Sequence, residues 1–155
     1  MKLYLVRHGI TVTANGEQTL SEMGIQQTQE IGRFLKQSGV KIDAILHSEK
    51  LRAQQTAQLI GQIVEPDLTP IQSPGLKPDD PIAPILQEIA TFDRDVMIVS
   101  HLPLLEKLLT ILTLGIDTLC PIDFCGTCVV CLQGTGHIWQ IAWVISPQLI
   151  HSRHA

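Results

Sequence analysis

The chain has 155 residues, of which 45% are hydrophobic and 17% charged, and its formal net charge is −4. This length predicts a single domain over residues 1–155, and the composition excludes intrinsic disorder because disordered chains are poor in apolar residues. The acidic balance has the wrong sign for a protein that coats nucleic acid or an anionic membrane, although it allows a local basic pocket.

The N-terminus predicts a cytoplasmic protein. Only residues 3–6 form an apolar run before Arg7, which is much shorter than the hydrophobic region of a signal peptide. No stretch of 18 consecutive apolar residues occurs, so no membrane-spanning helix is expected. An uncharged segment, residues 124–152, is interrupted by glycines and Pro147, and we interpret it as two buried strands and their turn.

Strands and helices are expected to alternate along the chain. The apolar run of residues 3–6 is typical of a buried strand, and polar residues 15–19 follow it. Ser21 is expected to cap a helix over residues 22–37, which ends before Gly39. Spacing of apolar residues then predicts strands over residues 42–46, 96–99, 127–132 and 137–145, and helices over residues 49–63, 82–91 and 102–114.

This alternation predicts an α/β fold with three layers, α/β/α, around a mostly parallel sheet. Six prolines between residues 65 and 84 indicate that this stretch is mostly loop. The Gly-Thr-Gly sequence at residues 134–136 is typical of a hairpin turn, so the last two strands should add an antiparallel edge.

Polar residues follow three of the expected strands. Arg7-His8-Gly9 ends the first, His47-Ser48 ends the second with Arg52 in the following helix, and Ser100-His101 ends the third. Ligands of open α/β sheets bind beyond these strand ends. If the three strands are neighbours, two arginines and two histidines form one cationic pocket that suits an anion such as phosphate.

Four blocks in order resemble motifs of the histidine phosphatase superfamily, also called phosphoglycerate-mutase-like. They are Leu-Val-Arg-His-Gly at residues 5–9, Leu-Ser-Glu-Met-Gly at residues 20–24, the Ser-x-x-x-Arg-Ala-x-Gln-Thr-Ala segment at residues 48–57, and Ser100-His101. Within this superfamily, the short chain and the sequence Ser-His-Leu-Pro-Leu at residues 100–104 resemble the bacterial SixA-type protein phosphohistidine phosphatases, which have no inserted cap domain.

The resemblance implies a phosphatase that needs no metal or cofactor. His8 would attack phosphorus and form a phosphohistidine intermediate, and Arg7, Arg52 and His101 would bind the phosphoryl oxygens. The nucleophile must be neutral, and two neighbouring arginines are expected to lower its pKa. His101 would be protonated once the anion is bound.

The sequence departs from the family pattern at the acid that protonates an alkoxide leaving group. Glu17, Asp79 and Asp80 lie in expected loops and are candidates, but none can be assigned. Ile10 and Ala14 also replace polar residues that are common in the family, with Asn15 one position after Ala14. An imidazole is a better leaving group than an alkoxide, so an unassigned acid favours phosphohistidine as the substrate.

The most favoured function is therefore dephosphorylation of phosphohistidine in a phosphorylated protein. The alternatives are a small-molecule phosphomonoesterase acting on a phosphate ester, and a non-catalytic module that binds phosphate or a phosphoprotein. A third alternative is a metal-binding regulatory domain built on Cys120, Cys125, Cys128 and Cys131.

The cysteines and the remaining histidines are expected to be structural. Cys128 and Cys131 lie three residues apart in an expected strand, so their side chains should point to opposite faces and could not share a metal ion. We interpret the thiols as reduced, buried small hydrophobes. His47 and His137 are expected at the surface or a sheet edge, as are His151 and His154, which with Arg153 should form a frayed tail.

Overall fold

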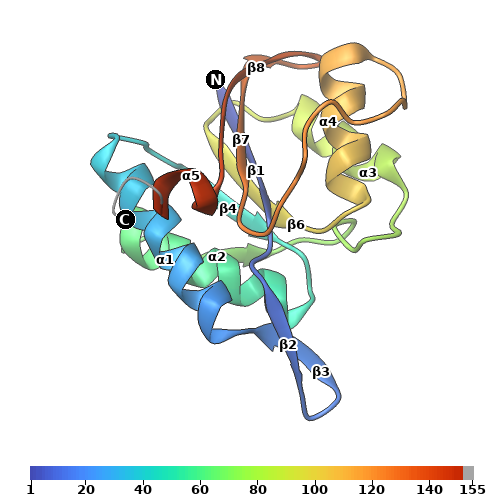
Figure 1. Cartoon of the computed structure of the whole chain (residues 1–155). Helices are drawn as coiled ribbons and strands as arrows, with labels where there is room; N and C mark the ends of the chain where they lie inside the picture. Colours follow the sequence, from blue (N-terminus) through green and yellow to red (C-terminus); the bar gives the residue numbers. More distant parts are fainter. Residues whose placement is uncertain (152–155) are drawn as a thin grey trace.

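The computed structural model describes residues 1–151, in which one six-stranded sheet has helices on both faces (Figure 1). A two-stranded hairpin projects from this sheet. The strands are β1 (Lys2–Arg7), β2 (Thr11–Ala14), β3 (Glu17–Leu20), β4 (Ala44–His47), β5 (Ile71–Gln72), β6 (Val96–Ser100), β7 (Val129–Thr135) and β8 (Ile138–Ile145). The helices are α1 (Glu22–Gln37), α2 (Leu51–Val64), α3 (Ile82–Ala90), α4 (Leu104–Leu114) and α5 (Pro147–His151).

The sheet is parallel in one half and antiparallel in the other. Its strand order is β5-β4-β6-β1-β7-β8, and the pairs β5-β4, β4-β6 and β6-β1 are parallel. Strand β7 pairs antiparallel with both β1 and β8. The expected α/β fold, with a mostly parallel sheet and an antiparallel edge hairpin, is therefore confirmed.

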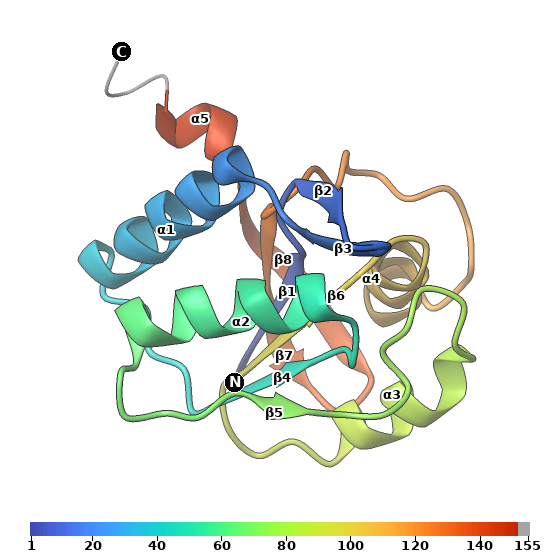
Figure 2. The ribbon, with the colours of Figure 1, turned by 90° about the horizontal axis from the view of Figure 1, so that it is seen from below.

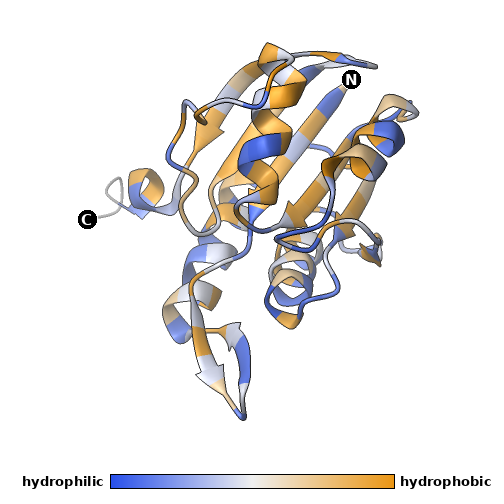
Figure 3. Cartoon of the chain, turned by 90° about the vertical axis from the view of Figure 1, so that its right-hand side faces the viewer, coloured by the Kyte–Doolittle hydropathy of each residue, from blue (hydrophilic) through white to orange (hydrophobic). Residues whose placement is uncertain are grey.

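Strand β1 separates two hydrophobic cores because successive side chains of a strand point to opposite faces. Leu3 and Leu5 pack with buried residues of α3 and α4, whereas Tyr4 and Val6 pack with those of α1 and α2. Figure 2 shows the two pairs of helices on opposite sides of the sheet, and Figure 3 shows that the strands between them are largely apolar. The site described below lies where these buried strands end.

Helix α1 fixes the loop that follows β1. The Oγ of Ser21 accepts a hydrogen bond from the backbone N–H of Gly24 at 3.0 Å, which caps the helix as expected. A Cβ at Gly24 would overlap the carbonyl oxygen of Ile10, so only glycine allows this close approach. The glycine of the Leu-Ser-Glu-Met-Gly block thus brings the loop after His8 against the start of α1.

Four elements were not expected from the sequence: the strands β2 and β3 of the hairpin, the short strand β5 and the short helix α5. The other elements begin and end within about three residues of their expected bounds. None of the helices in residues 1–151 has the length and apolarity needed to cross a membrane.

Candidate active site

The three strands that carry the polar residues are neighbours. Strand β6 pairs with β4 on one side and with β1 on the other, and all three run parallel. The backbone N–H of His8 donates to the carbonyl of Ser100 at 3.0 Å, and that of Ser48 donates to the carbonyl of Val99 at 3.1 Å. The strand ends therefore meet at one edge of the sheet, where the sequence placed them.

His8 is held in a defined orientation. Its ring lies 5.1 Å from the ring of His101, measured between centroids. The Nδ1 atom of His8 is 2.8 Å from the carbonyl oxygen of Gly9. Because a carbonyl only accepts, Nδ1 carries the proton of the neutral ring and the lone pair is on Nε2. The neutral His8 thus presents an unprotonated nitrogen.

The pKa of His8 is lowered to about 4, and burial is the largest cause. The positive charges of Arg52 and Arg7 lower it further, while the hydrogen bond to Gly9 opposes the shift. The sequence predicted a lowered pKa but attributed it to the arginines, which come after burial. His8 is neutral at neutral pH even without a bound anion.

Three residues that interact with His8 each carry a buried nitrogen atom without a hydrogen-bond partner. Of the buried side-chain nitrogens in residues 1–151, only the Nε atoms of Arg7 and Arg52 and the Nδ1 of His101 lack one. A second nitrogen of Arg7, Nη1, donates to the carbonyl oxygen of Phe124 at 2.8 Å. Buried donors are nearly always paired, so a cluster of unpaired ones is suited to an anionic ligand.

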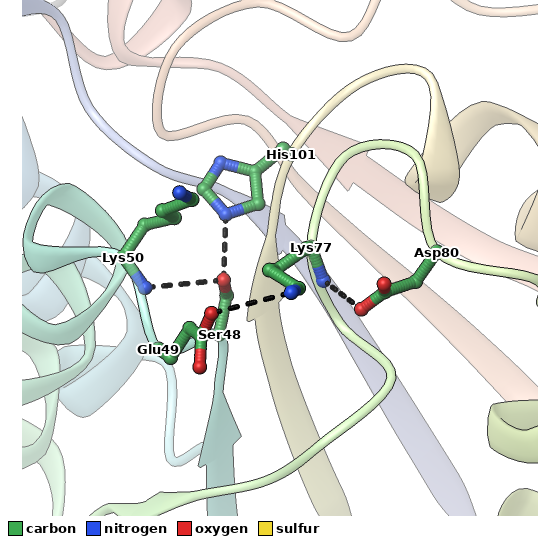
Figure 4. A network of polar contacts seen from close by, with 6 residues as sticks. All are labelled: Ser48, Glu49, Lys50, Lys77, Asp80 and His101. Carbon is green, nitrogen blue, oxygen red and sulfur yellow. Dashed lines mark hydrogen bonds and ion pairs between the residues drawn. The ribbon is translucent and has the colours of Figure 1, made fainter.

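His101 is oriented by Ser48 at the end of β4. Its Nε2 lies 2.8 Å from the Oγ of Ser48, which also accepts from the backbone N–H of Lys50 at 3.3 Å (Figure 4). Burial is the main cause that lowers the pKa of His101 to about 3, followed by the charges of His8, Arg52, Lys50 and Arg7. A bound anion would oppose this shift, which fits the expectation that His101 is protonated in the complex.

The block at residues 48–57 connects the loop after β1 to helix α2. The Oγ1 of Thr56 accepts from the backbone N–H of Gly9 at 3.1 Å and donates to the carbonyl of Arg52 at 2.8 Å. The Oε1 of Gln55 accepts from the backbone N–H of Leu20 at 2.9 Å. No role was expected for Ser48, Gln55 and Thr56 from their places in this block. In the structure Ser48 contacts the His101 ring, and Gln55 and Thr56 hold the backbone of residues 20 and 9.

The candidate acids lie outside this cluster. Glu17 is exposed on the projecting hairpin, Asp79 is exposed, and Asp80 accepts from the backbone N–H of Lys77 at 2.9 Å. In Figure 4 the side chain of Asp80 is directed toward that backbone nitrogen. No carboxylate is among the groups that shift the pKa of His8 or His101.

A pocket of about 270 Å³ opens beside His8. It is lined by Arg7 at the end of β1, by Gly9, Ile10 and Thr11 that follow His8, and by Gly126. Gly126 belongs to residues 124–128, which precede β7 and are called the 124–128 loop below. No sequence motif indicates that this loop borders the site.

The other histidines are placed differently from one another. His47 is only 3% exposed and its Nδ1 lies 2.9 Å from the carbonyl of Ser48, so the expected surface position is wrong, because β4 extends one residue further than expected. His137 and His151 are exposed as expected, but His151 ends helix α5, with its Nδ1 4.0 Å from a carboxylate oxygen of Glu30, so the expected frayed tail is wrong at this residue. His154 and Arg153 lie outside the described residues.

The cysteines do not form a common cluster. Cys128 packs in the core against α3 and α4 and Cys131 packs in the core against α1 and α2, which confirms their placement on opposite faces. All four thiols are free, and residues 1–151 contain no group of three or more potential ligands that could hold a metal ion.

Comparison with known proteins identifies relatives of this chain. A family model described as the histidine phosphatase superfamily (branch 1) matches residues 3–77. The phosphohistidine phosphatase SixA of Escherichia coli strain K12 is 28% identical over 127 residues, which cover 74% of this chain and 76% of SixA.

Solved structures show the same fold. The protein histidine phosphatase SixA complexed with tungstate matches with a TM-score of 0.86 at 23% identity, over 97% of this chain and 99% of that one. A phosphoserine phosphatase mutant from Entamoeba histolytica, in complex with phosphoserine, matches with a TM-score of 0.72 at 18% identity, over 95% of this chain and 98% of that one.

Proposed function

This chain belongs to the histidine phosphatase superfamily, and we propose that it is a phosphatase that removes the phosphoryl group from phosphohistidine in a protein. One observation carries the proposal: Arg7, Arg52 and His101, each with an unpaired buried nitrogen, interact with a neutral His8 whose Nε2 is unprotonated. We also propose that residues 1–155 act as one domain in the cytoplasm, without a nucleic-acid or membrane partner.

The proposed reaction has two displacements at phosphorus. The Nε2 lone pair of His8 forms a bond to phosphorus while the bond to the leaving group breaks, and the leaving group takes that electron pair and a proton. Water then attacks the phosphohistidine on the opposite side, loses its proton, and the N–P electron pair returns to His8. The first step requires a neutral His8, and its lowered pKa supplies that form at neutral pH.

Arg7, Arg52 and His101 are assigned to the equatorial phosphoryl oxygens. Their unpaired nitrogens come from β1, α2 and the residue after β6, and the Nδ1 of His101 donates once that ring is protonated. Negative charge on these oxygens must be stabilised in the transition state, and preorganised donors do so without reorganisation. The arginines thus supply the positive charge that the reaction needs.

Phosphohistidine is favoured as the substrate by two observations. The three candidate carboxylates have no described contact with the cluster, and an imidazole leaving group depends less on a strong acid than an alkoxide does. The relative SixA of Escherichia coli carries the name of a phosphohistidine phosphatase.

A small-molecule phosphomonoesterase is the second candidate. The fold is shared with a phosphatase whose structure holds phosphoserine, a phosphate ester with an alkoxide leaving group. Turnover of such esters without release from phosphohistidine would favour this candidate, and phosphate binding without turnover of either would favour a non-catalytic binding module.

The test is phosphate release from a phosphohistidine-bearing protein in the presence of EDTA, with wild type and His8→Ala compared. Wild type is expected to release phosphate and His8→Ala is expected to release none. The control is His137→Ala, which removes an exposed histidine outside the cluster and should match wild type. Equal release by wild type and His8→Ala would contradict the proposed nucleophile.

A further inference from the structure

The 124–128 loop brings two cysteines together. The backbone N–H of Cys128 donates to the carbonyl of Cys125 at 3.1 Å, which closes a four-residue turn. Such a turn brings its end Cα atoms within about 7 Å of one another, and the Cα atoms of disulfides lie about 4.4–6.8 Å apart. Both thiols are free, so the loop holds a dithiol whose spacing is compatible with a disulfide.

The two thiols are chemically different. Cys125 is partly exposed and Cys128 is only 1% exposed. Interaction with the Cys128 thiol lowers the pKa of Cys125 to about 7, whereas the same interaction and burial raise the pKa of Cys128. Since the thiolate is the nucleophile, Cys125 is the attacking sulfur and Cys128 is the sulfur that resolves a mixed disulfide.

The same loop holds Arg7 through its backbone. The carbonyl of Phe124, one residue before Cys125, accepts from the Arg7 guanidinium at 2.8 Å. The N–H of Thr127 donates to the Arg7 carbonyl at 3.0 Å, and the Arg7 N–H donates to the Cys128 carbonyl at 3.3 Å. A change in the conformation of this turn must therefore be transmitted to Arg7.

We propose that Cys125 and Cys128 form a reversible disulfide that weakens anion binding in the adjacent pocket, a redox regulation that rests on the proposed phosphatase function. An S–S bond is about 2.05 Å long, so its formation draws the two sulfurs together and tightens the turn. The Phe124 carbonyl then moves relative to the Arg7 guanidinium, and the pocket loses the donor geometry that binds phosphate.

The oxidant in this proposal is another disulfide, either in a small molecule or in a second protein. The Cys125 thiolate attacks one sulfur of the donor, whose S–S bond breaks, and the departing sulfur takes the electron pair and a proton. Cys128 then loses its proton and attacks the sulfur of Cys125, which releases the second donor thiol. Two electrons pass from the cysteine pair to the donor, and reduction reverses both steps.

The test equilibrates the full chain in buffers of defined ratios of oxidised to reduced glutathione. Free thiols are trapped by alkylation, the disulfide is located by peptide mass mapping, and the affinity for inorganic phosphate is measured by calorimetry on both forms. Because a hydrogen bond to a charged group contributes more than a neutral one, displacement of Arg7 should raise the phosphate Kd about tenfold. Activity should fall in parallel.

Three variants keep the test specific. Cys125→Ser changes a partly exposed side chain and should retain the reduced-state affinity at every glutathione ratio, whereas Cys120→Ser should respond to oxidation as wild type does. Circular dichroism of each variant checks folding, and Cys128→Ala repeats the measurement at the second sulfur.

Absence of the Cys125–Cys128 disulfide, or equal phosphate affinity in both forms, would overturn the switch while leaving the phosphatase proposal intact. Conversely, reduced protein that releases no phosphate from any substrate would overturn the phosphatase proposal. In that case the phosphate Kd of the reduced and oxidised forms would still test the proposed redox regulation, because binding is measured without turnover.

Discussion

The parallel and antiparallel halves of the sheet contribute different groups to the candidate site. The charged and titratable side chains lie at or just after the ends of the parallel strands β1, β4 and β6. Because neighbouring parallel strands end at the same edge of a sheet, these side chains lie close together. The antiparallel half contributes backbone: the Phe124 carbonyl, Gly126 and the Cys128 carbonyl. One half of the sheet therefore supplies the reactive side chains, and the other half orients Arg7.

Removal of a charged group from the parallel half should have the largest effect. Arg52→Ala takes away a guanidinium whose Nε has no partner in the protein, so the variant loses a donor to the phosphoryl group. We expect kcat/KM to fall about 10²–10³-fold in steady-state kinetics. Arg33→Ala, which removes an exposed arginine of α1, is the control, and a loss below tenfold for Arg52→Ala would argue against its assigned role.

Acid should affect both function and stability through the same two histidines. The pKa values of His8 and His101 lie at about 4 and about 3, below the unfolded value of about 6.5. Below pH 6.5 the unfolded chain therefore binds protons that the folded protein does not, and unfolding becomes easier as the pH falls toward 4. Each such proton contributes about 1.4 kcal/mol per pH unit.

The midpoint of urea unfolding, measured at several pH values between 6.5 and 4, tests this effect. The midpoint should decrease less steeply with falling pH in His101→Asn than in wild type. The value of kcat/KM should fall below about pH 4, where His8 becomes protonated and loses its lone pair. Saturating phosphate should stabilise the protein, since an anion favours the protonated form of His101. A midpoint that does not change over this range would contradict the buried, neutral state of both rings.

The positioning role of Thr56 predicts an intermediate effect. Thr56→Val retains the shape of the side chain but leaves the N–H of Gly9 without its acceptor, and Gly9 is the residue whose carbonyl orients His8. We expect kcat to fall about tenfold and the unfolding free energy by about 1–3 kcal/mol. Thr56→Ser should restore most of both, whereas a purely structural role would lower the stability without affecting kcat.

A small change in the antiparallel half tests whether that half matters at all. A Cβ at Gly126 would lie 3.3 Å from Ile10, which also lines the pocket, and this is a tight contact. Gly126→Ala should therefore weaken phosphate binding a few-fold, as measured by calorimetry. Gly136→Ala at the distant β7-β8 turn is not expected to change it. Equal affinity in wild type and Gly126→Ala would confine the site to the parallel half.

The same division explains what the sequence could predict. The motif blocks mark side chains, and because parallel strand ends share one edge of a sheet, Arg7, His8, Arg52 and His101 could be grouped before the structure was known. The hydrogen bond from the Arg7 guanidinium to the backbone carbonyl of Phe124 joins residues 117 positions apart. Any residue at position 124 could accept this hydrogen bond, because the acceptor is a backbone atom. Local sequence therefore contains no signal for it.

The missed β2-β3 hairpin did have a signal. Asn15 and Gly16 both have positive φ and connect the two strands, and Asn-Gly is a favoured two-residue hairpin turn. The strands themselves are mostly exposed, so they lack the alternation of buried and polar residues by which strands were assigned elsewhere. His47 was misplaced for a simpler reason: one extra residue of strand changes a side chain from surface to core.

The smallest effect is expected at the three candidate acids, because neither the parallel nor the antiparallel half of the sheet brings them into the site. Glu17→Gln, Asp79→Asn and Asp80→Asn should each change kcat on phosphohistidine less than about twofold, because protonation of an imidazole leaving group does not require a positioned acid. The same variants should be compared on a phosphate ester. A loss of about 10²-fold or more for one variant on the ester alone would identify an acid that approaches the pocket only with substrate bound, and would favour the phosphomonoesterase. A comparable loss on phosphohistidine would show that the strand ends and the 124–128 loop do not contain the whole site.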